Sequence, residues 1–429
     1  MQTFHVQNFG CRASQADGAA IESALIREGL NPAPNSSQAE FVVLNSCTVT
    51  SFADEDVRKS IHRVHRENPE ARILVTGCYA QRAPEELAAI PGVHWVVGNS
   101  HKVRIPEIIT ESENLYHSQV HIGDIFAQHD FLSAPVEEAA GERTRPNLKI
   151  QDGCNNRCSF CIIPFVRGRS RSAPAEQVIG QVRDLAARYR EVVLSGINLG
   201  RWGREPGSTM RLADLIRRLL NETSIERLRL SSVEPMDWSD DLLGLVASSP
   251  RIGKHVHAPL QSGSDRVLRR MYRKYRPRHY EDRIMKAREW IPDAAIGADV
   301  MTGFPGETDA EFEETRAFIE RLPFTYLHVF TYSERPGTPA ALAKQVPMEV
   351  RRDRNRVLRE LAAEKNLEFR RRMLGRSLSV VTLGSGALTD NFLKVELAMP
   401  RQANLLIDVK IGSLTPAGLR EYNALTVLS

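Results

Sequence analysis

The sequence predicts an α/β protein of three parts: an N-terminal parallel-sheet α/β domain, a central partial (β/α)6 barrel and a small C-terminal all-β barrel. Apolar runs alternate with helical stretches over residues 1–120, and the alternation resumes over residues 146–346. Such alternation favours parallel sheets covered by helices. Residues 374–429 instead contain strand-like runs separated by turn residues. This pattern favours a closed barrel, because closure removes exposed sheet edges.

The N-terminal part contains four apolar runs and three helical stretches. We expect strands at residues 4–8, 41–45, 73–76 and 95–98, and helices at residues 17–28, 53–67 and 84–90. The following residues, 121–145, contain scattered Gly and Pro and the acidic pair Glu137 and Glu138. This composition is typical of a linker.

The central part, residues 146–346, contains six strand–helix units, which make up most of a barrel. In such barrels the loops at the C-terminal ends of the strands carry the chemistry. The expected strands are residues 147–151, 191–196, 225–231, 254–258, 294–301 and 326–331. The expected helices are residues 175–188, 211–221, 240–248, 264–272, 278–290 and 309–322.

The C-terminal part follows a long charged helix expected at residues 347–373. Its turn residues lie at 384–386 and 389–391. We expect its strands at residues 378–383, 392–396, 404–411 and 423–428.

Composition excludes several classes of protein. Hydrophobic residues make up 42% and charged residues 26% of the 429 residues, which is enough apolar material for a folded core. No apolar run approaches the ~20 residues that cross a bilayer, and residues 1–10 are typical of a strand rather than a signal peptide. We therefore expect a cytoplasmic protein with no membrane partner. The net charge of +4 is too small to indicate nucleic-acid binding by itself.

Three of the six cysteines lie on one loop after the first central strand: Cys154, Cys158 and Cys161, with the spacing C-x3-C-x2-C. Three thiolates on one loop can ligate three irons of a cubane cluster and leave the fourth iron open. A structural zinc site is the alternative, but zinc prefers four ligands and the nearest histidine in sequence is His129. Unrelated buried cysteines are a third possibility. The grouping favours the cluster.

The other cysteines, Cys11, Cys47 and Cys78, each follow an apolar strand of the N-terminal part. The carboxyl ends of parallel strands meet at one edge of the sheet, where such sheets place their ligands. We therefore expect the three thiols to converge on a second cluster. Buried structural cysteines are the alternative, although these usually lie within strands.

The Cys154–Cys161 segment, with Phe160 before its last cysteine, resembles the signature of radical S-adenosylmethionine enzymes. The whole chain resembles the methylthiotransferases of that superfamily. That family has an N-terminal three-cysteine domain, a radical S-adenosylmethionine barrel and a C-terminal RNA-binding barrel called the TRAM domain. Further segments that carry the resemblance are Thr76-Gly-Cys-Tyr-Ala-Gln81, Leu230-Ser-Ser-Val-Glu-Pro235, Pro259-Leu-Gln-Ser-Gly-Ser264 and Gly303-Phe-Pro-Gly-Glu-Thr308.

The resemblance implies two [4Fe-4S] clusters and S-adenosyl-L-methionine as cofactors. The central cluster generates a radical from S-adenosylmethionine in this family, and the N-terminal cluster carries the sulfur. A second S-adenosylmethionine methylates that sulfur. The residues expected to contact the cofactor follow the second to fifth barrel strands, although each could instead serve a turn or a helix cap. They are Gly196, Asn198, Ser232, Glu234, Gln261, Ser262, Gly303 and Glu307.

Two further segments resemble the branch of the family that acts on N6-threonylcarbamoyladenosine beside the anticodon of tRNA: Cys47-Thr-Val-Thr50 and Tyr332-Ser-Glu-Arg-Pro-Gly-Thr338. The product would be the 2-methylthio derivative. We expect Arg335 to bind the substrate carboxylate, because a guanidinium can do so through two hydrogen bonds. A surface turn at Pro336-Gly337 is the alternative.

Basic residues concentrate in residues 266–278, where seven Arg/Lys are interleaved with Tyr272 and Tyr275, and in residues 351–376, which hold ten Arg/Lys against four acids. Solvated helix faces usually explain such runs, and contact with phosphates is the alternative. The expected partners are tRNA, an electron donor such as flavodoxin or ferredoxin, and a sulfur source. Two alternative substrates are isopentenyl-adenosine in tRNA and a ribosomal-protein aspartate. A non-catalytic iron–sulfur RNA-binding protein is an alternative of another class.

Overall fold

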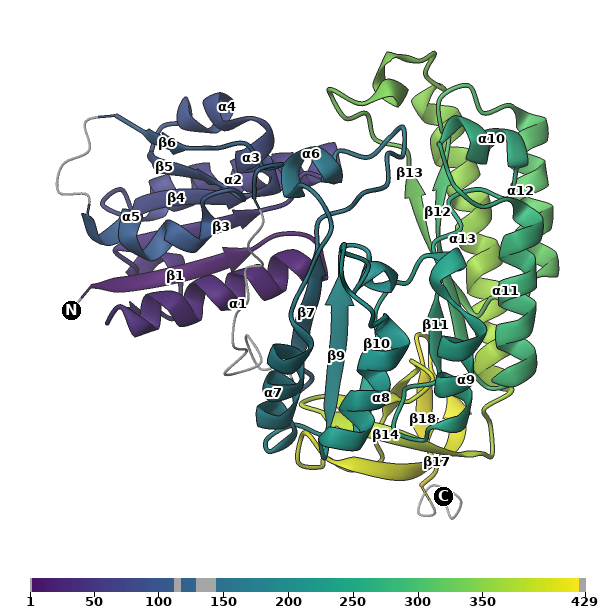
Figure 1. The fold of residues 1–429 in the computed structure, drawn as a ribbon. Helices are drawn as coiled ribbons and strands as arrows, with labels where there is room; N and C mark the ends of the chain where they lie inside the picture. The colour runs from purple at the N-terminus through teal and green to yellow at the C-terminus, as the bar shows by residue number, and fades with distance from the viewer. Residues whose placement is uncertain (1, 112–116, 129–143, 424–429) are drawn as a thin grey trace.

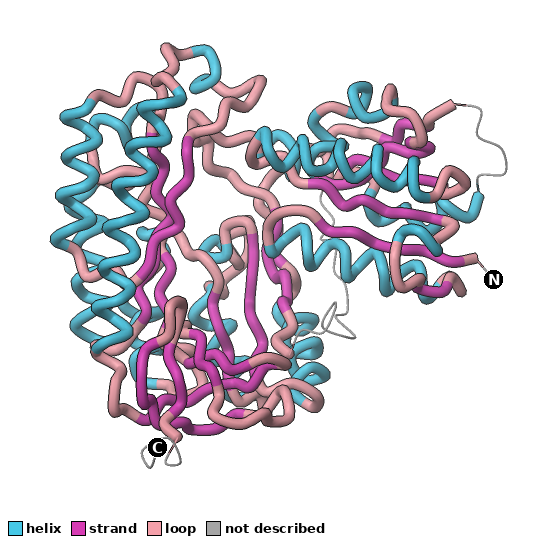
Figure 2. The backbone as a smooth tube through the Cα atoms, turned by 180° about the vertical axis from the view of Figure 1, so that it is seen from behind, coloured by secondary structure: helices cyan, strands magenta, loops and turns pink. Residues whose placement is uncertain are grey.

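The computed structural model describes residues 2–111, 117–128 and 144–423. The N-terminal α/β domain lies at one side of the central barrel, and the C-terminal barrel lies below the central strands (Figures 1 and 2). The predicted three-part α/β architecture is therefore confirmed. Among the described residues, no helix combines the length and the apolar character needed to cross a bilayer.

The N-terminal domain contains a six-stranded parallel sheet with the order β2-β1-β3-β4-β5-β6. The predicted strands are β1 (Thr3–Asn8), β3 (Phe41–Ser46), β4 (Arg72–Gly77) and β5 (Val93–Gly98). Two edge strands, β2 (Asn31–Pro32) and β6 (Gln119–His121), were not predicted, because they are too short to produce a pattern. The helices are α1 (Arg12–Arg27), α2 (Ser51–Glu67), α3 (Cys78–Arg82), α4 (Pro84–Ala88) and α5 (Ile105–Glu111).

Both faces of this sheet are covered, as the continuous apolar character of β3 requires. Val42 and Leu44 pack in a cluster with Ile61 of α2, whereas Val43 packs in another with Leu25 of α1. α1 begins five residues earlier than expected, directly after Cys11, so its first turn lies at the carboxyl edge of the sheet.

The central barrel contains all six expected strands in two ladders: β7 (Asn147–Asp152), β9 (Glu191–Gly196) and β10 (Arg227–Leu230), then β11 (His255–His257), β12 (Ala295–Thr302) and β13 (Tyr326–Thr331). A parallel bridge between Leu228 and Ile252 links the ladders, and a short antiparallel strand, β8 (Arg171–Ser172), borders β7. The helices are α6 (Ile163–Arg167), α7 (Ala175–Ala186), α8 (Leu212–Glu222), α9 (Asp240–Ser248), α10 (Asp265–Arg270), α11 (Pro277–Trp290) and α12 (Asp309–Arg321).

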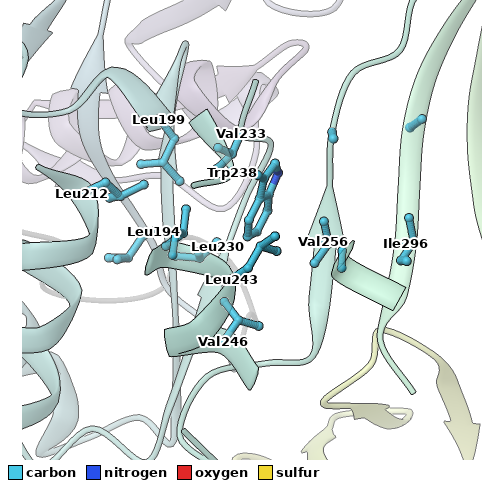
Figure 3. Close-up of a cluster of buried hydrophobic side chains, with 14 of the residues drawn as sticks. Leu194, Leu199, Leu212, Leu230, Val233, Trp238, Leu243, Val246, Val256 and Ile296 are labelled. Atoms are coloured by element: carbon cyan, nitrogen blue, oxygen red, sulfur yellow. The ribbon is translucent and has the colours of Figure 1, made fainter. Parts of the chain in front are cut away.

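The apolar core of the barrel lies between its strands and the outer helices. Figure 3 shows Leu194 and Leu230 on neighbouring strands beside Leu243 and Val246 of α9. Side chains alternate along a strand, so the residues between these face the inside of the barrel. That inner face is polar, and it includes Glu191, Arg229, His255, His257 and Asp299.

The C-terminal part begins after α13 (Met348–Arg371) and is a closed barrel with the order β14-β15-β16-β18-β17. Two of its strands were not predicted, since each holds only three or four residues. Residues 424–428 of the strand predicted at 423–428 lie outside the described residues. The strands are β14 (Ser377–Leu383), β15 (Gly386–Thr389), β16 (Lys394–Glu396), β17 (Leu406–Leu414) and β18 (Leu419–Glu421).

Arg229 forms hydrogen bonds that link the C-terminal barrel to the central barrel. Its guanidinium donates to both carboxylate oxygens of Glu191, at 2.8 and 3.1 Å, and to the backbone carbonyls of Thr389 and Asp390, both at 2.9 Å. The Phe392 ring stacks on His255, with ring centroids 4.4 Å apart, and lies under the Arg229 guanidinium. The C-terminal barrel therefore closes the lower end of the large barrel.

We expect Arg229→Met to destabilise the protein by about 3–5 kcal/mol, because it leaves the Glu191 carboxylate buried without its main partner. Although burial alone would raise it, Arg229 holds the pKa of Glu191 below its ordinary value of 4.5. The pair therefore stabilises the protein fully above about pH 4.5, and its contribution declines as the pH falls further. Thermal unfolding measures the effect.

Arg190→Met is the matched control, because Arg190 forms an exposed ion pair with Glu226. Exposed pairs contribute about 0–1 kcal/mol. Equal unfolding midpoints for the two variants would contradict the role of Arg229.

Candidate active site

The three N-terminal thiols converge at the carboxyl edge of the sheet, as expected from their positions after β1, β3 and β4. Cys11 is exposed at the start of α1, whereas Cys47 and Cys78 are buried. Gly10, with φ +87°, passes so close to Cys47 that an added Cβ would lie 2.4 Å from the Cys47 Cβ. Burial, together with the neighbouring Cys78 and Cys11 thiols, raises the pKa of Cys47 to about 12. Thiolates in such a group require compensating positive charge from a metal or from the protein.

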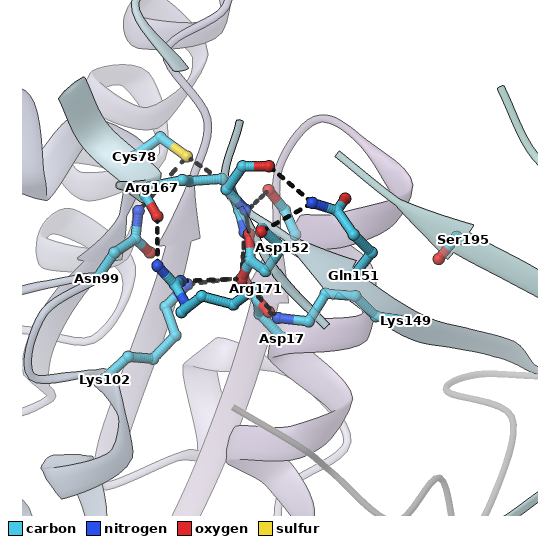
Figure 4. Close-up of polar contacts among 12 residues, drawn as sticks. Asp17, Cys78, Asn99, Lys102, Lys149, Gln151, Asp152, Arg167, Arg171 and Ser195 are labelled. Carbon is cyan, nitrogen blue, oxygen red and sulfur yellow. Dashed lines mark hydrogen bonds and ion pairs between the residues drawn. The ribbon is translucent and has the colours of Figure 1, made fainter. Parts of the chain in front are cut away.

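A buried ionic network supplies positive charge beside Cys78 (Figure 4). The Arg167 Nε of α6 donates to the Cys78 Sγ at 3.2 Å, and Asn99 donates to the same sulfur at 3.6 Å. Arg167 also donates to Asp17 of α1 and to Asp152 of β7, both at 3.0 Å. Although burial alone would lower it, Cys78 and the two carboxylates hold the pKa of Arg167 above its usual range.

Two lysines complete this network. Lys102 lies 2.9 Å from Asp17, and Lys149 bonds to both Asp17 and Asp152. Three buried cations thus face two carboxylates, and Arg171 also lies 3.9 Å from Asp152, so positive charges outnumber negative charges next to the Cys78 sulfur. Sequence patterns missed this network, because no local signal marks a charge that becomes buried between domains.

The central cysteines lie on the loop after β7, and all three are partly buried. The Asn156 backbone N–H donates to the Cys154 Sγ at 3.4 Å, and Cys161 N–H donates to the Cys158 carbonyl at 3.1 Å. Burial raises the pKa of Cys161 to about 12, and the Cys158 and Cys154 thiols add to the shift. Three sulfur atoms on one tightly bonded loop fit the expected three-ligand iron–sulfur cluster.

A second buried arginine serves this loop. Arg273 Nη1 donates to the Cys158 Sγ at 3.3 Å, while its Nη2 bonds to Glu234. The sequence placed Arg273 in the basic run at 266–278 and did not single it out. The structure buries it, so each group of thiols has one arginine that donates to a cysteine sulfur.

Asn198 and Gly196, two of the expected cofactor residues, lie beside the central cysteines. Asn198 Nδ2 lies 3.7 Å from the Cys154 Sγ, and its backbone N–H donates to the Gln151 side chain at 2.6 Å. The Asn198 Oδ1 is buried and has no hydrogen-bond partner. A Cβ at Gly196 would lie 2.9 Å from the Gln151 Cβ, so glycine keeps this wall close to the loop. An unpartnered acceptor at this point fits the ammonium group of S-adenosylmethionine.

Of the other residues expected to contact the cofactor, only some lie beside the central cysteines. Glu234 pairs with Arg273 beside Cys158, and Ser232 is partly buried two residues before it. Gln261 is partly buried with φ +63°, and its backbone bonds to Asp299 and Met301 of β12.

Ser262, Gly303 and Glu307 form hydrogen bonds with each other or with residues of neighbouring helices. The Ser262 hydroxyl lies 3.0 Å from that of Thr315 on α12. Glu307 accepts from the Gly303 N–H at 2.8 Å and from Arg354 of α13 at 2.7 Å. Phe304 contacts Phe160, with centroids 6.4 Å apart, so the loop of Gly303 still borders the cysteine loop.

Arg335, the expected substrate cation, is buried and makes its contacts within the chain. Its Nη1 lies 2.7 Å from Asp54 of α2 and 3.2 Å from the carbonyl of Thr48, the residue after Cys47. Its Nη2 donates to Ser333 at 3.2 Å, and its Nε donates to the Glu334 carbonyl at 2.7 Å. Arg335 therefore joins the last barrel strand to the N-terminal cysteine site, and its role toward substrate stays a prediction.

Comparisons with known proteins agree with this arrangement. Residues 148–319 match the radical SAM superfamily, and residues 3–98 match the uncharacterized protein family UPF0004. The chain is 36% identical over 408 residues to the threonylcarbamoyladenosine tRNA methylthiotransferase MtaB of Aquifex aeolicus, covering 94% of this chain and 99% of that protein. It is 39% identical to the protein of the same name from Bacillus subtilis, over 82% of this chain and 79% of that protein.

A further relative is the tRNA-2-methylthio-N(6)-dimethylallyladenosine synthase of Syntrophomonas wolfei, 34% identical over 85% of this chain and 84% of that protein. Among solved structures, the radical S-adenosylmethionine methyltransferase TsrM of Kitasatospora setae has the same fold, with a TM-score of 0.55 and 14% identity over 80% of this chain and 77% of that one. With two groups of three thiols on this fold and relatives matched over most of their length, the chain belongs to the radical S-adenosylmethionine methylthiotransferase family of enzymes.

Proposed function

We propose that this protein methylthiolates tRNA, and that its substrate is N6-threonylcarbamoyladenosine next to the anticodon, which it converts to the 2-methylthio derivative. The observation that carries the proposal is the presence of two separate thiol triads, each with a buried arginine donor. The substrate assignment is supported by the relatives from Aquifex aeolicus and Bacillus subtilis, which are named for threonylcarbamoyladenosine. The relative from Syntrophomonas wolfei keeps isopentenyl-type adenosine as the second candidate.

The proposal assigns a [4Fe-4S] cluster to each triad. When bound, the central cluster supplies the electron that cleaves S-adenosylmethionine, and the N-terminal cluster supplies the sulfur. Cys154, Cys158 and Cys161 hold the first, and the Asn198 Oδ1 accepts a hydrogen bond from the cofactor's ammonium group. Cys11, Cys47 and Cys78 hold the second. Arg167 and Arg273 each donate to one sulfur, which favours the reduced state of the cluster that this sulfur binds.

The same proposal requires partners of defined chemistry. A small electron-transfer protein such as flavodoxin or ferredoxin supplies the electrons, and a separate sulfur source restores the transferred sulfur. A cytoplasmic location follows from tRNA as the substrate.

The surface proposed to contact tRNA lies in residues 266–278. Four of its basic residues form ion pairs within the chain, since Arg269 and Arg276 pair with Asp265, Arg270 pairs with Glu311, and Arg273 pairs with Glu234. Arg266, Lys274 and Arg278 are exposed, and no carboxylate pairs with them in the described part of the chain. The Tyr272 ring between them is 58% exposed, which suits stacking on a base.

The C-terminal part contributes less charge than the proposed RNA-binding role of that module suggests. Residues 374–429 contain five Lys/Arg and four Asp/Glu, so they are nearly neutral. Phosphate binding depends on cations, and the basic run near the barrel mouth is therefore the stronger candidate.

The two thiol triads should be separable by mutation. We expect the Cys154→Ala/Cys158→Ala/Cys161→Ala variant to lose cleavage of S-adenosylmethionine. The Cys11→Ala/Cys47→Ala/Cys78→Ala variant should retain half of the wild-type iron, still form 5′-deoxyadenosine and make no methylthiolated nucleoside. Iron content and mass spectrometry of the products measure these outcomes. Methylthiolated product from the N-terminal variant would refute the proposed division of roles.

If the substrate assignment is correct, the enzyme should convert threonylcarbamoyl-tRNA more efficiently than isopentenyl-tRNA. A site built to bind the carboxylate and hydroxyl of a threonylcarbamoyl group would leave these polar partners unpaired when it holds the apolar isopentenyl group. We therefore expect the reconstituted enzyme to prefer threonylcarbamoyl-tRNA by about 100-fold or more in kcat/KM. Nucleoside mass spectrometry measures both products, and equal conversion would refute the substrate assignment.

Reversing two charges near the barrel mouth should weaken RNA binding. We expect Arg266→Glu/Lys274→Glu to lower the affinity for tRNA by about tenfold and to reduce the slope of log K against log [salt] by about 2, one unit per phosphate contact. The matched control is Arg352→Glu/Arg359→Glu, which reverses two exposed charges on α13. A larger loss from the control would place the contact surface on α13 instead.

A further inference from the structure

Arg12 is a half-buried cation for which no carboxylate in the described part of the chain lies within ion-pair distance. It follows Cys11 directly and begins α1, and its side chain is partly buried. No described carboxylate forms an ion pair with it, in contrast to Arg167, Arg229, Arg273 and Arg335. The guanidinium groups of Arg145 and Arg229 lie near Arg12, and Glu191 offsets only part of their positive charge. A half-buried cation among like charges is an arrangement that an anion would stabilise.

The first turn of α1 is held against the barrel. The Asn147 side chain at the start of β7 donates to the Arg12 carbonyl at 2.8 Å. Arg12 interacts electrostatically with Glu191 of β9 and with Tyr326 of β13, both on the inner face of the barrel. The N-terminal domain therefore contributes a cation to the inside of the central barrel.

A cavity of about 700 Å³ lies at this junction. Arg12, Gln15, Arg145, Asn147 and Val193 are among the residues that line it, and so are residues 383–385 of the C-terminal barrel. The Thr144 hydroxyl and the Asn147 Oδ1 are buried there without hydrogen-bond partners. A volume in the range of ~300–1,000 Å³ is typical of sites for small molecules.

The ladder of β11, β12 and β13 contains a partly buried carboxylate, Asp299. Asp299 of β12 lies 3.2 Å from His257 of β11 and 3.2 Å from His328 of β13. Although burial alone would raise it, these two imidazoles hold the pKa of Asp299 below its usual range. On the ladder of β11, β12 and β13 the Asp299 carboxylate thus has two imidazole partners, whereas Arg12 has no ion-pair partner among the described residues.

We propose that Arg12 binds the carboxylate of the threonylcarbamoyl group, and that Arg145 and the unpartnered Thr144 hydroxyl line the same pocket. This inference rests on the proposed function, and it identifies Arg12 as the residue that recognises the charged substituent of the proposed substrate. Arg335 is less suited to the role, because Asp54, Thr48, Ser333 and Glu334 already accept its hydrogen bonds. The position of Arg12 next to Cys11 would also hold the substituent close to the thiols proposed to carry the sulfur.

The test compares two RNA substrates and three enzyme variants. One anticodon stem-loop carries threonylcarbamoyladenosine, and the other carries its neutral carboxamide, which removes the charge and keeps the shape. We expect the wild-type holoenzyme to prefer the carboxylate RNA by about tenfold or more in kcat/KM and in Kd, as for a charge-assisted hydrogen bond. Arg12→Gln should reduce this preference to about twofold or less, and Arg12→Lys should keep part of it, because an ammonium lacks the planar fork.

Arg27→Gln is the matched control, because Arg27 is exposed in the last turn of the same helix. It should keep the wild-type preference. The iron content of each variant shows whether the neighbouring Cys11 site is still loaded, and Kd reports on binding independently of turnover.

Three outcomes would overturn the inference. If wild-type enzyme binds and converts the two RNAs equally well, no cation of the enzyme binds the carboxylate. A preference that survives in Arg12→Gln assigns the carboxylate to another residue. An equal loss for both RNAs indicates that Arg12 contacts a phosphate. A different result would contradict the proposed function itself: wild-type enzyme would convert isopentenyl-tRNA but not threonylcarbamoyl-tRNA.

Discussion

The contact between Arg167 and Cys78 is the interaction on which the arrangement of the two thiol triads depends. Arg167 lies six residues after Cys161, so the same stretch of chain carries the central cysteines and the donor to an N-terminal cysteine. The two carboxylates that hold its guanidinium come from different domains, Asp17 from α1 and Asp152 from β7. Loss of the Arg167 guanidinium would remove a cation from a buried carboxylate in each domain, and Lys102 and Lys149 would be their remaining buried partners. The network therefore fixes the orientation of the N-terminal domain on the barrel.

The net charge of this network also suits iron–sulfur chemistry. A cluster bound by three thiolates is anionic, and buried positive charge next to a cysteine sulfur stabilises it. Arg273 repeats the arrangement at Cys158, with Glu234 as the carboxylate that orients the guanidinium. Hydrogen bonds to cluster sulfurs are among the factors that set reduction potentials. Arg167 and Arg273 thus each hold a cysteine in place, and the same hydrogen bond would tune the reduction potential of the cluster proposed to bind there.

The polar interior of the central barrel has a structural cause. Its apolar side chains face the outer helices, so the alternate residues of each strand are left on the inside. Those residues include Glu191, Arg229, His255 and Asp299, and they tolerate burial because they pair with one another or with the C-terminal barrel. The Phe392 ring stacks on His255 at the lower end of this interior. A packed shell around a polar interior is suited to a substrate with both an aromatic base and a charged substituent.

The sequence by itself determined the three-part fold, the six barrel strands and the convergence of the thiols, because strand periodicity and the position of each cysteine after a strand are local signals. Asn198 and Glu234, two of the residues expected to contact the cofactor, lie beside the cysteine loop, and their role toward the cofactor stays a prediction. Only the tertiary structure decided the partners of the arginines. Arg167, Arg229, Arg273 and Arg335 are all buried in ion pairs, whereas Arg12 has no described carboxylate within ion-pair distance. The reason is physical: the environment of a charged side chain depends on which distant residues pack around it, and no local pattern in the chain encodes that packing.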